Sequence, residues 1–246
     1  MAYNNSDQED IVKNVIYNVL LIFCIPIGII IGRTKDENKK QKIDTMQNSR
    51  EAVMDNKELI LKSALDLFYA KGYDAVGVQE IVDKAGISKP TLYYYFGSKL
   101  GLLQNLLETG YQEFESRLID IARPGESLPG VLYQAARTFF DYAASNQNFY
   151  LFMLSLFYSG RENEAYKTVS PLIERYYKII VKIFEDASPQ LGNMRGRQEL
   201  FAVGFTGVLN HHIMTVSYGL SEEERFEISD ETTYEIVHQF MYGIYS

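Results

Sequence analysis

Residues 88–99, SKPTLYYYFGSK, place three tyrosines and a phenylalanine in consecutive positions between a proline and a lysine. Phenol hydroxyls donate and accept hydrogen bonds, and lysine ammonium groups donate them. Lys84, Lys89 and Lys99 fall in the window of residues 84–107, which contains no Asp or Glu. The segment therefore combines hydrogen-bonding rings with a local positive charge, a surface suited to phosphates and to the edges of nucleic-acid bases.

The elements that must position these side chains are two short helices. A helix is predicted to begin after Ser88, whose hydroxyl can accept from a free amide of the first turn. Pro90 falls in that turn, where its missing N–H costs nothing. Before it, apolar residues between Val78 and Ala85 mark another short helix, and Gly86 ends it where a left-handed residue is usually needed. Two short helices joined by only three residues, Ala85, Gly86 and Ile87, form a helix-turn-helix.

The second of these helices separates a packing face from a contact face. At about 100° per residue, Leu92 and Phe96 share one face and can pack on the preceding helices. The residues that point the opposite way are Pro90, Thr91 and Tyr94, and those that flank the boundary are Tyr93 and Tyr95. The alternative is a buried aromatic cluster whose hydroxyls are satisfied internally, which the helix-turn-helix spacing makes the weaker interpretation.

Helical patterns also cover the rest of the chain. Apolar residues recur at spacings of three and four from Asn56 until Gly72, and a long helix is predicted from Leu100 to about Leu118. Further helical patterns cover roughly residues 130–145, 148–159, 163–187, 195–219 and 230–244. Since no segment with strand periodicity competes, the predicted fold class is all-α.

The stretch AKGYDAVGVQEIVDKAGISKPTLYYYFGSKLGLLQNLLE resembles the DNA-binding domain of TetR/AcrR-type transcriptional regulators. The Gly-Tyr turn, the AGIS bend, the LYYYF helix and the SK opening of the next helix fall at the family's spacing within residues 55–110. Beyond them the match is only architectural. The resemblance implies a three-helix helix-turn-helix domain at residues 54–103 and a helical ligand-binding and dimerisation domain at residues 104–246.

Carried over position by position, the resemblance also implies roles for single residues. Those expected to approach base edges are Gln79, Lys89, Pro90 and Tyr93, and those expected to hold the phosphate backbone are Thr91, Tyr94, Tyr95 and Lys99. One departure is Gly77, where the family usually has a hydroxyl residue that caps the helix and touches phosphate. The implied partners are double-stranded DNA with a pseudo-palindromic operator and a second copy of the chain. The implied function is a transcriptional regulator, specifically a repressor released by a small-molecule effector.

The effector implied by the family would bind within the second domain. Nine aromatic residues lie between Tyr133 and Tyr158, which favours an apolar or aromatic ligand. The candidate pocket residues are Phe139, Phe149, Phe152, Met153 and Phe157. For any one of them, plain helical core is an equally good interpretation.

Composition argues against other chemistry. The single cysteine, Cys24, excludes an intrachain disulfide and a cysteine-built zinc site. His211 and His212 are adjacent, so their rings point about 100° apart and cannot form the i, i+4 pair that a metal favours. The chain lacks a Gly-rich phosphate loop, a nucleophile elbow and an HExxH motif. We therefore expect no enzyme activity, no cofactor and no metal.

The charge distribution fits DNA binding at one site rather than along the whole surface. The net charge is −8, and residues 111–246 hold 11 Lys/Arg against 18 Asp/Glu, a balance of −7. This acidity argues against a protein that coats nucleic acid indiscriminately.

The family pattern does not require residues 1–53, which carry a candidate transmembrane segment at residues 15–31. These 17 residues would span about 26 Å, short of a hydrocarbon core of about 30 Å. Acidic residues precede the segment and basic residues follow it, so a spanning helix would leave a regulator cytoplasmic and anchored to the inner face of the membrane. One alternative is translation from Met46 or Met54. Another is a membrane-anchored interaction protein that uses the helical domain as a binding module.

Overall fold

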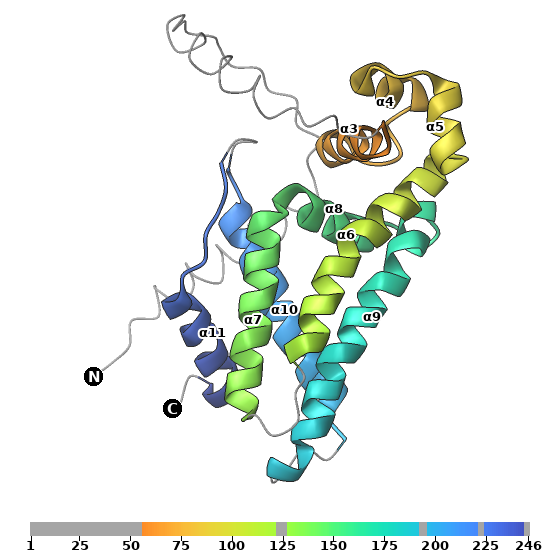
Figure 1. The fold of residues 1–246 in the computed structure, drawn as a ribbon. Coiled ribbons are helices and arrows are strands. Elements are labelled where there is room, and N and C mark those ends of the chain that lie inside the picture. Colours follow the sequence, from red (N-terminus) through yellow and green to blue (C-terminus); the bar gives the residue numbers. More distant parts are fainter. Residues whose placement is uncertain (1–55, 122–126, 192–195, 221–223, 244–246) are drawn as a thin grey trace, which may run out of the picture. The chain divides into compact units, whose positions relative to one another are not determined.

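The computed structural model describes residues 56–121, 127–191, 196–220 and 224–243, and the candidate membrane segment lies outside these residues. The helices are α3 Asn56–Lys71, α4 Val78–Ala85, α5 Lys89–Phe96, α6 Lys99–Ile121, α7 Leu128–Ser145, α8 Gln147–Phe157, α9 Glu164–Ala187, α10 Gln198–Ser217 and α11 Asp230–Tyr242, with a 3-10 turn at Ser188–Gln190 (Figure 1). No strand occurs in the described ranges, which confirms the all-α prediction.

The capping residues predicted from the sequence define the end of α4 and the start of α5. Gly86 ends α4 in the left-handed region at φ 65° and ψ 30°. The Ser88 hydroxyl then accepts from the amide of Thr91 at 3.4 Å, so α5 begins at the next residue. The first short helix therefore spans the predicted residues, and the second begins where predicted.

A tight turn joins α5 to α6. Gly97 has φ 71°, and the Ser98 hydroxyl caps α6 by accepting from the amide of Gly101 at 2.9 Å. A Cβ at Gly101 would lie 2.0 Å from the carbonyl oxygen of Phe96, so only glycine permits this approach. The turn therefore fixes the start of α6 against the end of α5.

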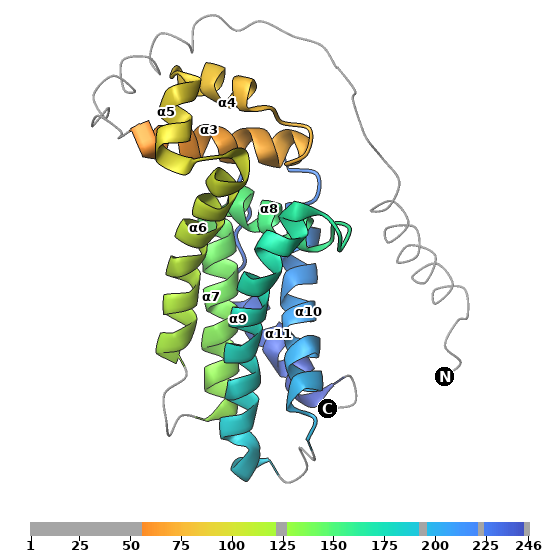
Figure 2. The ribbon, with the colours of Figure 1, turned by 90° about the vertical axis from the view of Figure 1, so that its right-hand side faces the viewer.

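The core of the second domain is an aromatic cluster centred on Phe114 of α6. Its ring lies 4.9 Å from Phe139 of α7, 5.0 Å from Tyr142 of α7, 6.0 Å from Tyr150 of α8 and 5.8 Å from Tyr176 of α9, between ring centroids. Helices α6, α7 and α9 run side by side here, and α8 crosses at the end that contacts α3 (Figure 2). Four helices thus meet at one fully buried ring.

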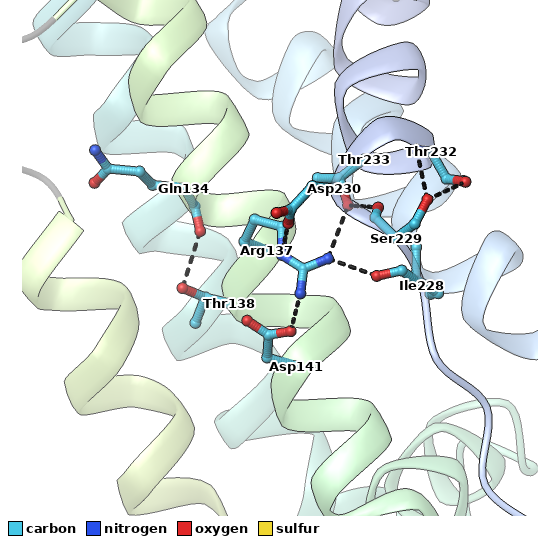
Figure 3. A network of polar contacts seen from close by, with 9 residues as sticks. All are labelled: Gln134, Arg137, Thr138, Asp141, Ile228, Ser229, Asp230, Thr232 and Thr233. Atoms are coloured by element: carbon cyan, nitrogen blue, oxygen red, sulfur yellow. Dashed lines mark hydrogen bonds and ion pairs between the residues drawn. The ribbon is translucent and has the colours of Figure 1, made fainter.

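Arg137 of α7 holds the segment that leads into α11. Its guanidinium donates to the carbonyl oxygen of Ile228 at 2.6 Å and to the Thr233 hydroxyl at 3.2 Å, and it pairs with Asp141 and Asp230 (Figure 3). The Ser229 hydroxyl caps α11, as it accepts from the amide of Thr232 at 3.1 Å. One arginine therefore positions the last described helix.

Substitution of Phe114 by alanine should lower the free energy of unfolding by about 3–5 kcal/mol, because it removes the ring shared by four helices and leaves a cavity. The matched control is Ile119→Ala on the same helix, whose side chain is 57% exposed and should change stability by less than about 0.5 kcal/mol. Urea denaturation followed by circular dichroism measures both values. Equal losses in the two variants would contradict the central role of the cluster.

Candidate nucleic-acid interface

Helix α5 buries one face and presents the other to solvent. Leu92 and Phe96 are buried, whereas the side chain of Tyr93 is 46% exposed and that of Tyr94 is 83% exposed. Lys89 and Pro90 are exposed at the first turn. This arrangement matches the two faces predicted from the sequence and argues against an aromatic cluster buried as a whole.

The two remaining α5 candidates are partly engaged within the protein. Tyr95 is half-buried against the core, and its ring lies 5.2 Å from that of Tyr94. The Thr91 hydroxyl lies 2.8 Å from the Ser88 hydroxyl. The assignment of both residues to phosphate stays a prediction, and each hydroxyl retains bonding capacity because a hydroxyl is both donor and acceptor.

The lysines of this region differ in their environments. Lys84 pairs with Asp66 of α3 at 3.0 Å between Nζ and Oδ2. The Lys99 ammonium lies 4.1 Å from the centre of the Tyr73 ring. Lys89 has no ion-pair partner in the part of the chain that the structure describes. The positive charge counted along the sequence is therefore partly neutralised, and Lys89 is the cation most available to a ligand at α5.

Lys99 is partly buried at the start of α6. Burial lowers its pKa, while the carboxylates of Asp74 and Glu164 act in the opposite direction. The lysine still stands at the start of α6, beside the cap formed by Ser98. The structure thus gives Lys99 an internal partner, and its phosphate contact stays a prediction.

Helix α4 carries the last candidate, Gln79. Its side chain is exposed, and its amide nitrogen donates to Oδ1 of Asp83 at 2.7 Å. Gly77 stands at the N-cap with φ −89° and makes no side-chain cap, as its residue type requires. A contact of Gln79 with a base would replace its exposed hydrogen bond to Asp83. This base contact also stays a prediction.

The residues predicted to line an effector pocket separate into core and cavity. Phe139, Phe149, Phe152 and Met153 are buried in the core. Phe157 is half-buried and lines a cavity of about 640 Å³ between α8, α9 and α10. The lining side chains that sequence reasoning missed are Tyr166, Ser170, Ile173, Glu174, Tyr176, Tyr177, Val203, Thr206 and Asn210.

A buried polar group forms the inner wall of this cavity. Oδ1 of Asn210 accepts from the hydroxyl of Tyr150 at 2.6 Å, and its amide nitrogen lies 3.5 Å from the hydroxyl of Tyr176. Burial raises the pKa of Tyr176 to about 12, although the hydrogen bond from Asn210 opposes the rise. Tyr176 is therefore a neutral phenol near pH 7, able to donate to a bound polar group.

Comparison with known proteins identifies the helix-turn-helix formed by α4 and α5. Residues 60–106, from α3 into α6, match the family described as bacterial regulatory proteins, tetR family. Residues 60–106 thus form a DNA-binding domain of the TetR family. Its helix-turn-helix is thus the family's DNA-binding element, and α6 to α11 make up the helical domain that follows.

Two named relatives align with this chain over different lengths. It is 42% identical over 86 residues to the HTH-type transcriptional repressor BdcR of Escherichia coli, covering 33% of this chain and 44% of BdcR. It is 28% identical over 189 residues to the HTH-type transcriptional activator FasR of Mycolicibacterium smegmatis, covering 75% and 80%. The chain thus spans less than half the length of the first of these relatives.

A solved structure supports the fold of the second domain. The chain superposes on the transcriptional regulator FadR of Bacillus subtilis, solved in complex with stearoyl-CoA, with a TM-score of 0.64. The two are 18% identical, and the alignment covers 76% of this chain and 98% of FadR. At this identity the likeness shows the fold alone.

Two other expectations concern metals and membranes. The described residues contain no group of three or more His, Cys, Asp or Glu side chains that could hold a metal ion. Within the same described ranges, no helix is both long and apolar enough to span a bilayer.

Alanine at Tyr93 and at Tyr94 should have different effects on DNA binding. Tyr93→Ala should cost about 1–3 kcal/mol on DNA selected from a random pool by the unaltered protein, and much less on random DNA, since its predicted contact is to a base edge. Tyr94→Ala should weaken binding to both DNAs similarly, since its predicted contact is to phosphate. Fluorescence anisotropy at fixed salt measures both, with Ile119→Ala as the control. The same ratio of losses in the two variants would refute the division of roles.

Proposed function

We propose that this chain is a sequence-specific DNA-binding regulator of transcription, with α3–α5 as the DNA-binding unit and α6–α11 as the effector-binding and dimerisation unit. The observation that carries the proposal is the α5 helix. It packs through Leu92 and Phe96 and leaves Lys89, Tyr93 and Tyr94 free to approach DNA. We assign the chain no catalytic role.

The direction of regulation differs between the named relatives. BdcR is named a repressor and FasR an activator. We propose a repressor released by its effector, since steric exclusion of polymerase needs only a bound protein. A transcription assay on the selected operator tests this: repression by the purified chain is expected, and stimulation would overturn it while leaving DNA binding intact.

The proposed dimer face lies on α10 and α11. Leu200, Val203 and Val208 recur along α10 with exposures of 66%, 55% and 44%. Gly204 and Gly207 interrupt the same exposed stripe, where a Cβ at Gly207 would meet no atom of this chain within 4 Å. Apolar side chains beside glycines suit close approach of another helix, and Tyr234 and Tyr242 of α11 add exposed aromatic surface.

Val208→Glu should convert the dimer to a monomer, because each interface would then bury two additional carboxylates without partners. The matched control is Ile119→Glu, also at an exposed apolar position but on α6. Sedimentation velocity gives the mass of each variant. Dimerisation of Val208→Glu at the concentration where the unaltered protein is dimeric would remove α10 from the interface.

The cavity between α8, α9 and α10 is the proposed effector site. Its walls are aromatic, and its inner end offers Tyr176, Thr206 and Asn210 as hydrogen-bonding groups. A ligand with an apolar or aromatic body and one polar group matches this lining. The binding of stearoyl-CoA by FadR, a protein of the same fold, makes fatty acids and their thioesters the first compounds to test.

A phenylalanine at Ser170 should fill the cavity, because this half-buried serine lines it from α9. Any fatty acid or acyl-CoA that raises the melting temperature of the unaltered protein should then give no shift with Ser170→Phe. Lys182→Phe, an exposed position on the same helix whose ion-pair partner Asp186 also lies outside the cavity lining, is the control and should retain the shift. An undiminished shift in Ser170→Phe would place the ligand elsewhere.

A further inference from the structure

Two hydrogen bonds connect the DNA-binding helices to the start of α9. The hydroxyl of Tyr73 donates to Oε1 of Glu164 at 2.9 Å. The amide nitrogen of Asn163 donates to Oδ2 of Asp74 at 2.7 Å. Tyr73 and Asp74 form part of the turn between α3 and α4, whereas Asn163 and Glu164 begin α9. We refer to these four residues as the polar joint.

The Tyr73 side chain is fixed by more than its hydrogen bond. Its ring is buried, lies 5.2 Å from that of Phe68 and carries the ammonium of Lys99 at 4.1 Å. Burial and the neighbouring Glu164 raise the pKa of the phenol far above its ordinary value, so it stays a neutral donor to the carboxylate. A hydrogen bond to an ionised acceptor is stronger than one between neutral groups.

Asn163 links the joint to the helix that carries it. Its Oδ1 accepts from the amide of Ala165 at 2.7 Å and so caps α9, while its amide nitrogen reaches Asp74. A shift of the first turn of α9 would therefore move both hydrogen bonds of the polar joint at once. Such bonds are directional and weaken steeply with misalignment.

The same turn of α9 borders the cavity. Tyr166, two residues after Glu164, stacks on Phe157 with ring centroids 5.9 Å apart and planes at 24°. Both rings line the cavity between α8, α9 and α10. Asn163 and Glu164 thus lie between these two lining residues along the chain, so an occupant that displaces the stacked pair acts on the start of α9.

We propose that the polar joint reports occupancy of the cavity to the DNA-binding helices. An occupant that separates Phe157 from Tyr166 shifts the start of α9, breaks the bonds to Tyr73 and Asp74, and releases the turn between α3 and α4. The orientation of α5 then depends on the packing of α3 against α8, which includes the stacked rings of Phe68 and Phe152, and on α6. This inference rests on the proposed function, since it assigns the route between the two proposed sites.

Variants that remove one hydrogen bond without removing a ring test the joint. Tyr73→Phe keeps the buried ring and the lysine above it, and Glu164→Ala removes the acceptor while leaving a good helix former at the start of α9. The matched control is Lys167→Gln. It removes an ion pair at the same end of α9, in which Nζ of Lys167 lies 2.9 Å from Oε2 of Glu162. That pair does not reach the α3–α4 turn.

The first readout needs neither DNA nor effector. Spin labels at Lys62→Cys on α3 and Glu185→Cys on α9, in a Cys24→Ser background diluted with excess unlabelled Cys24→Ser protein, report the distance between the two regions within one chain by double electron–electron resonance. A single narrow distribution is expected for the unaltered joint and for Lys167→Gln. A broadened distribution is expected for Tyr73→Phe and for Glu164→Ala.

The second readout is affinity for the DNA selected from a random pool. Tyr73→Phe and Glu164→Ala should change it at least about fivefold in the same direction, within the usual range of allosteric coupling. The double variant should match the single ones, because both remove the same bond. Unchanged distance distributions, or affinities within twofold of the unaltered protein, would overturn the proposal. Failure of the unaltered chain to select DNA would instead overturn the proposed function.

Discussion

The packing of Phe114 against rings from three other helices is the interaction on which the arrangement of the second domain depends. Aromatic rings prefer edge-on or offset contacts, so a ring with four such neighbours fixes the helices in angle as well as in distance. Helix α6 is held by this cluster along its second half and contacts α3 and α5 along its first. The aromatic core therefore also determines the position of α5, the proposed recognition helix.

The turn from α5 into α6 fixes the position of α5 relative to α6. Gly97 takes a positive φ, and Gly101 leaves room for the Phe96 carbonyl, so the two helices follow each other without a flexible linker. In a dimer, DNA binding requires two recognition helices at a fixed separation, because half-sites repeat with the helical turn of DNA. A rigid connection between core and recognition helix meets that requirement, and any change of helix packing near α6 or α9 alters the separation.

The polar contacts between the two parts of the protein have a different physical character from the core. The joint between the α3–α4 turn and α9 is built from two side-chain hydrogen bonds beside the stacked rings of Phe68 and Phe152. Apolar stacking tolerates small sliding movements, whereas hydrogen bonds depend on direction. This combination allows the domains to remain attached while their relative orientation responds to the start of α9.

The sequence by itself determined the helices and the outward face of α5. Ser88, Gly86 and Pro90 act on backbone groups within four residues, so their effects can be derived from the chain alone, and the 3.6-residue period places Leu92 and Phe96 inward. It could not determine which lysines are neutralised or which aromatic residues line the cavity. Asp66 reaches Lys84, Tyr73 lies under Lys99, and the cavity draws on α9 and α10 as well as α8. Such contacts join residues far apart in the chain, and only the packing of the helices around α6 decides which of them meet.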